Sequence, residues 1–106
     1  MPMYLIAAKY TQQGVQGLLK EGGSSRRKAV EEMARSLGGR VESFYFAFGM
    51  SDVFVVVDMP DAATAASVSL TVNASGSVTT TTVPLLTIEE MDEATRKTVS
   101  YRAPGR

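Results

Sequence analysis

The stretch "VESFYFAFGMSDVFVVVDMPD", residues 41–61, decides the fold. Its first part, "VESFYFAF" (41–48), is rich in aromatic residues, and its second part, "DVFVVVDM" (52–59), has an unbroken apolar centre. The connection "GMSD" between them carries the glycine and aspartate typical of a tight turn. Short apolar runs separated by such a turn predict two paired antiparallel strands.

Both predicted strands carry apolar side chains on both faces. Successive side chains of a strand point to opposite faces. In the first strand we therefore place Phe44 and Phe46 on one face and Val41 and Tyr45 on the other. Both sides of this part of the sheet are expected to be covered.

The rest of the chain supplies the other elements. Residues 15–25 are expected to hold one helical turn that breaks at Gly22 and Gly23. Apolar and β-branched runs predict strands at 3–10 and 77–86. Helical spacing and capping residues predict helices at 25–39 and at 87–99, and a third helix that begins after the N-cap Asp61 and ends at 73–76.

The order β-α-β-β-α-β is that of the ferredoxin-like α+β sandwich, here with an extra C-terminal helix. We predict a single domain over 1–106, with two helices on one face of four antiparallel strands. The opposite face would remain open, although it is apolar. We therefore expect a homo-oligomer, a dimer or higher, formed through that face.

Composition narrows the functional classes. The 106 residues carry 11 basic and 11 acidic side chains, and neither cysteine nor histidine. The balanced charge argues against nucleic-acid binding and against attachment to a membrane surface. The lack of cysteine and histidine, the usual ligands, argues against a transition-metal site, and we expect no cofactor. No apolar run is long enough for a membrane helix. The N-terminus lacks the pattern of a signal peptide, so we expect a cytoplasmic protein.

Basic residues open the helix at 25–39. The run Arg26, Arg27 and Lys28 lies in its first turn, where positive charge opposes the helix dipole. A solvated surface explains this run best. An anion site near the same helix end is the alternative.

Three aspartates lie in the stretch 41–61, each at or next to the end of a predicted element. Asp52 follows the turn, Asp58 marks the end of the second strand, and Asp61 suits a helix N-cap. All three are explained by structural roles. Asp52 is also the one candidate catalytic residue, because partial burial beside the aromatic strand would raise its pKa, as a general base requires.

Few other side chains are candidates for binding. Tyr10 and Tyr45 lie in strands and have hydroxyls that can orient a ligand, although core packing explains them better. Arg40 precedes a strand and can pair with a ligand carboxylate, or lie on the surface. These three are the candidate ligand-binding residues. Alternation sends the threonines of the row 79–82 to both faces in pairs, and high β-propensity explains them.

Four stretches carry a family resemblance: "MPMYLIAAKYTQQG" (1–14), "SLGGRVESFYF" (36–46), "GMSDVFVVVDMPD" (49–61) and "LLTIEEMDEATRK" (85–97). Together they resemble the GYD domain family, small proteins related in architecture to the dimeric α+β barrels. The resemblance implies a ferredoxin-like fold, sheet-to-sheet association and an interior cavity, with no settled activity. Gly49 and Asp52 stand where the Gly-Tyr-Asp motif would lie, but Met50 and Ser51 fill the gap and the tyrosine is absent.

The sequence leaves two functions in competition. The first is a non-catalytic homo-oligomer or small-ligand binder, which the apolar sheet and the scarcity of catalytic groups favour. The alternative is a cofactor-independent enzyme of the dimeric α+β barrel type, acting on a small apolar or aromatic substrate with Asp52 as base. RNA binding ranks last, because basic residues do not interleave with Phe44 and Phe46.

Overall fold

The computed structural model describes all residues from Met1 to Arg106. Its elements follow the expected order, except that two helices rather than one connect the first two strands. They are β1 (Met3–Tyr10), α1 (Gln12–Glu21), α2 (Gly23–Ser36), β2 (Arg40–Phe46), β3 (Val53–Asp58), α3 (Ala62–Ala74), β4 (Val78–Leu85) and α4 (Ile88–Arg96).

Helix α1 is longer than the single turn that the sequence predicted. Thr11 caps it, because its side chain accepts a hydrogen bond from the Gly14 amide. Gly22, with φ of 86°, lies between the end of α1 and the start of α2. A positive φ is readily adopted by glycine, so the two helices can follow one another with only this residue between them.

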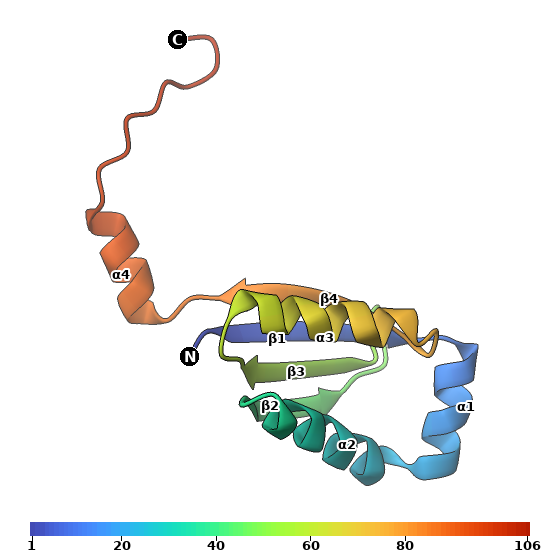
Figure 1. Ribbon diagram of the computed structural model, residues 1–106. Coiled ribbons are helices and arrows are strands. Elements are labelled where there is room, and N and C mark those ends of the chain that lie inside the picture. Colours follow the sequence, from blue (N-terminus) through green and yellow to red (C-terminus); the bar gives the residue numbers. More distant parts are fainter.

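The four strands form one antiparallel sheet in the order β2-β3-β1-β4. This is the strand order of the ferredoxin-like fold, so the predicted α+β class is confirmed. Figure 1 shows α2 and α3 side by side over one face of the sheet, with α1 at one end. We call the face beneath α2 and α3 the helix face and the opposite one the open face.

A β-bulge corrects one of the face assignments. The register between β2 and β3 shifts between Val41 and Ser43, so that Val41 pairs with Val57 and Phe44 pairs with Val55. Val41 therefore lies on the helix face together with Phe44, and not opposite it as simple alternation predicted. The extra residue at a bulge breaks the two-residue period, and the sequence pattern did not reveal it.

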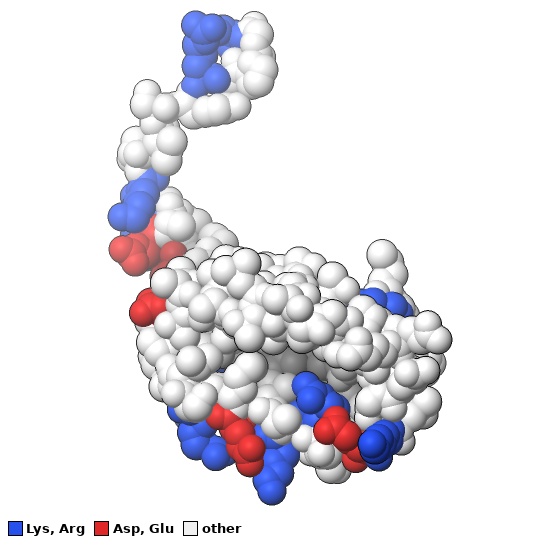
Figure 2. All heavy atoms as spheres, turned by 45° about the vertical axis from the view of Figure 1, so that its right-hand side comes forward, with Lys and Arg blue, Asp and Glu red and all other residues white.

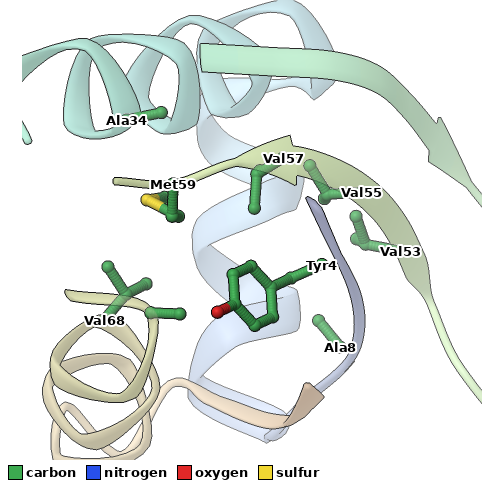
Figure 3. Packing of buried hydrophobic residues seen from close by; sticks show 9 residues of the cluster. Tyr4, Ala8, Ala34, Val53, Val55, Val57, Met59 and Val68 are labelled. Atoms are coloured by element: carbon green, nitrogen blue, oxygen red, sulfur yellow. The ribbon is translucent and has the colours of Figure 1, made fainter. Parts of the chain in front are cut away.

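The core lies between the helix face and the two helices. Val53, Val55 and Val57 of β3 are 3%, 5% and 1% exposed, because β3 is an inner strand and these side chains pack in the apolar cluster on the helix face. Figure 3 shows Met59 between Ala34 of α2 and Val68 of α3. These residues belong to one apolar cluster with Tyr4, Ala8 and Ala65.

The C-terminal segment stands away from this core. Helix α4 has no buried residue, and nearly all of the chain beyond it is exposed. Figure 1 shows α4 and the following residues extending well beyond the sheet. The radius of gyration is 16.9 Å, whereas a compact chain of this length has about 13 Å. We call residues 86–106 the C-terminal arm.

Candidate functional site

Asp52, the catalytic candidate, lies where three strands meet. Its carboxylate accepts a hydrogen bond from the Tyr10 backbone amide at 2.9 Å and one from the Lys9 ammonium at 3.2 Å. Its own amide donates to the Ala8 carbonyl, and its carbonyl accepts from the Ala47 amide, both at 2.7 Å. Asp52 therefore ties the turn after β2 to the end of β1.

These contacts set the charge of Asp52. The Tyr10 amide holds the pKa of the Asp52 carboxyl below its ordinary value, against the opposing effect of burial, and Lys9 lowers this pKa further. The direction is opposite to the raised pKa expected of a general base. A structural role accounts for every contact of this side chain, and its catalytic role stays a prediction.

The structure does not bring the candidate ligand residues together. The Tyr10 side chain lies on the helix face and lines a cavity there. Tyr45 pairs with Phe54 on the open face and is 70% exposed. Arg40 pairs with Asp58 at the far end of β3 from Asp52. These residues therefore cannot surround one ligand within a single chain.

Arg40 is occupied by carboxylates of its own chain. It forms ion pairs with Glu42 at 2.6 Å and with Asp58 at 3.3 Å. The Glu42 carboxylate, and then that of Asp58, raise the pKa of Arg40 above its ordinary value. Asp58 is 9% exposed, so Arg40 neutralises a nearly buried charge. Binding a ligand carboxylate would require Arg40 to release one of these partners.

The open face is apolar along its centre. One row across the strands contains Tyr45, Phe54, Ala7 and Thr81, and the next contains Ser43, Val56, Leu5 and Val83. No helix lies over these rows, so Phe54 and Val83 remain 39% and 44% exposed. An uncovered patch of this kind is typical of a protein-binding surface.

A cavity of about 120 Å³ lies on the helix face. Figure 1 shows α2 and α3 diverging toward the N-terminal end of α2, and Figure 2 shows a hollow at the surface with basic atoms on its rim. Seventeen residues line the cavity, of which 13 are hydrophobic. The polar ones are Arg26, Ser69, Thr80 and Thr82.

Sequence reasoning noted three of these polar positions without predicting that they line one cavity. Arg26 belongs to the basic run in which an anion site was the alternative, and Thr80 and Thr82 belong to the threonine row. The strand register places Thr80 and Thr82 on the helix face and Thr79 and Thr81 on the open face, as alternation predicted. Arg26 on α2 and these threonines on β4 become part of one site only because all of them line the cavity beneath the two helices.

Other kinds of site find little support among these residues. No three carboxylates lie close enough together to hold a metal ion. No buried polar side-chain atom lacks a hydrogen-bond partner. No helix has the combination of length and apolar character that spanning a membrane requires. The open face and the cavity are thus the two surfaces of interest.

The family model described as "GYD domain" matches residues 4–95, from β1 to the last turn of α4. The chain belongs to the GYD domain family. The match confirms the resemblance seen in the sequence, although Met50 and Ser51 replace the tyrosine of the motif. In this GYD domain protein the turn from Gly49 to Asp52 is held by the Asp52 contacts described above.

A relative with a descriptive name comes from Thermus thermophilus. It is called "Glutamine synthetase and cystathionine beta-lyase binding protein" and is 33% identical over 92 residues. The alignment covers 86% of this GYD domain protein and 95% of the relative. No solved structure matches the chain significantly.

Proposed function

We propose that the protein is a non-catalytic binding protein that works as a homo-oligomer, a dimer or higher. The observation that carries this proposal is the apolar open face of the sheet. Its central residues Leu5, Phe54, Val56 and Val83 come from three adjacent strands and form one continuous surface. No segment of the same chain covers it.

A second copy of the chain is a suitable cover for this face. In a two-fold symmetric dimer the same patch meets itself, and a central apolar patch satisfies this condition without special pairing. Face-to-face sheets pack about 10 Å apart, which lets side chains such as Phe54 and Val56 interdigitate. The Lys9–Asp52 and Arg40–Asp58 ion pairs lie toward opposite ends of the face, where they would form a polar rim.

The Thermus relative supports the proposal that the homo-oligomer in turn binds an enzyme. Its name states that it binds glutamine synthetase and cystathionine β-lyase. We propose that the oligomer of this chain likewise binds a metabolic enzyme, and these two enzymes are the first to test. The lowered pKa of Asp52, which the Tyr10 amide causes, fits a binding role better than one as a general base.

Association is tested by light scattering coupled to gel filtration at micromolar concentration. The wild type is expected to have at least twice the mass of one chain. Phe54→Lys places a charge at the centre of the open face and should give a folded monomer by circular dichroism. Leu19→Glu is the matched control, because Leu19 is 81% exposed on α1, away from the sheet faces. A wild-type monomer would refute the proposal.

Enzyme binding is tested by calorimetric titration with purified glutamine synthetase and cystathionine β-lyase from the same organism as the chain. Saturable binding to either enzyme supports the proposal. Titration of Phe54→Lys then shows whether the oligomer is the binding form. If neither enzyme binds while the wild type is oligomeric, the homo-oligomer stands and the choice of these partners is wrong.

A further inference from the structure

We propose that the cavity between α2 and α3 binds a small monocarboxylate with an apolar body, and that Arg26 holds the carboxylate. The cavity lies on the helix face, so the sheet separates it from the open face. The inference is therefore independent of the proposed oligomer. It specifies a chemical class of ligand for a site that has no role in the proposed protein binding.

The size and lining of the cavity suit an apolar group. Its volume is about 120 Å³, and its floor and walls include Ile6, Phe44, Val55 and Val72. An apolar cavity of about 150 Å³ in another protein binds benzene. The cavity here also reaches the surface (Figure 2), so a ligand can extend beyond it. A phenyl ring or a short branched alkyl chain fits such a space.

Arg26 supplies the polar end of the site. It is the one charged residue in the lining, and its side chain is 33% exposed, which leaves it in reach of both solvent and cavity. Its only ion-pair partner is Glu21, at 4.0 Å, and no side-chain hydrogen bond uses its guanidinium. A guanidinium has five N–H donors in a planar fork that matches a carboxylate. These donors are available to a ligand.

Two of the other three polar residues of the lining, Ser69 and Thr80, are already engaged in contacts with one another and with Asn73. Thr80 accepts a hydrogen bond from the Asn73 amide at 3.0 Å and lies 3.4 Å from the Ser69 hydroxyl. The hydroxyls of Ser69 and Thr80 therefore contribute little to the choice of ligand. A single cation, partly offset by Glu21, matches one negative charge better than the two of a phosphate monoester. The cavity thus favours a monocarboxylate over a phosphate or a neutral ligand.

The experiment uses the full-length protein and three probes that divide the proposed ligand into parts. Phenylacetate has both the ring and the carboxylate, benzyl alcohol has the ring alone, and acetate has the carboxylate alone. Binding is followed by NMR chemical-shift titration. Phenylacetate is expected to saturate with shifts at α2, α3 and Thr80, roughly tenfold more tightly than benzyl alcohol, and acetate is expected not to saturate.

Three variants locate the groups responsible. Arg26→Gln should weaken phenylacetate binding roughly tenfold and leave benzyl alcohol binding unchanged. Arg27→Gln is the matched control, because Arg27 pairs with Glu31 and does not line the cavity; it should bind like the wild type. Ala29→Phe fills the cavity from α2 and should block both aromatic probes.

Several results would overturn the proposal. Saturation by none of the probes would show that the cavity takes no such ligand. If the wild type binds phenylacetate and benzyl alcohol equally well, or if Arg26→Gln binds phenylacetate as tightly as the wild type does, Arg26 does not hold the carboxylate. A change in oligomer mass caused by Ala29→Phe would mean that a second copy occupies the cavity instead. Failure of Phe54→Lys to alter the oligomer bears only on the proposed function.

Discussion

The two faces of the sheet are built from the same strands but have different surroundings. On β3, Val53, Val55 and Val57 point to the helix face and are almost fully buried, whereas Phe54 points to the open face and is 39% exposed. Both sets are apolar. Burial in this chain therefore follows the cover that the helices provide, and not the character of the strand alone. An apolar residue on the open face is free to contribute to association.

The largest expected difference comes from a charge placed on each face. Val55→Lys buries an ammonium in the core, and we expect a loss of more than about 4 kcal/mol in the free energy of unfolding. Phe54→Lys should leave the chain folded. Urea denaturation followed by circular dichroism compares the two. Unfolding of both variants would show that the open face is as essential to the single chain as the helix face.

A milder pair of substitutions tests the same difference between the helix face and the open face. Val57→Ala leaves a space among side chains that are nearly fully buried, and we expect it to cost about 2–3 kcal/mol of unfolding free energy. Val56→Ala, one position earlier and on the open face, should cost less than about 1 kcal/mol. The measurement is made in the Phe54→Lys background, so that association does not contribute. Equal losses would indicate that some segment of the chain covers Val56.

The smallest expected effect concerns Asp52, in the connection between β2 and β3. Its pKa is lower in the folded protein than in the unfolded chain, so its contribution is present above about pH 4, and is lost as the pH falls through the folded pKa. Asp52→Asn should therefore cost about 1 kcal/mol at pH 7, and the difference from the wild type should shrink toward pH 3.

Asp61→Asn is the control for that measurement. Asp61 caps α3 through the Thr64 amide, and asparagine caps nearly as well as aspartate, so little change is expected. Denaturation midpoints at pH 7 and pH 3 give the comparison. A difference between wild type and Asp52→Asn that grows in acid would contradict the structural account of the Tyr10 and Lys9 contacts.

Local patterns were sufficient for most of the fold. The "GMSD" turn and the Asp61 cap lie where the sequence placed them, and a capping box of Thr87 and Glu90 begins the helix expected at 87–99. Such signals depend on residues within a few positions of one another. Helix α1 was underestimated, because Gly14 and Gly17 weaken its pattern and its stability depends on the Thr11 cap.

Features that depend on distant residues could not be predicted in the same way. The bulge beside Val41 becomes visible only when β2 is paired with β3. The site at Arg26 depends on the angle between α2 and α3, and no spacing along the chain encodes that angle. Asp52 is hydrogen-bonded to Lys9 and to the Tyr10 amide, which lie more than forty positions away in the sequence. Without these partners, burial alone predicted a raised pKa for Asp52, which is the wrong direction.

The C-terminal arm affects how the protein moves through solution. The chain measures 56 × 34 × 22 Å along its principal axes, because residues 86–106 lie outside the compact core. An elongated particle experiences more friction than a sphere of equal mass, so it diffuses more slowly and elutes earlier from a sizing column. A single chain of this shape would run close to a compact particle of larger mass. Elution volume alone would therefore imitate association, whereas scattered light intensity reports the mass itself.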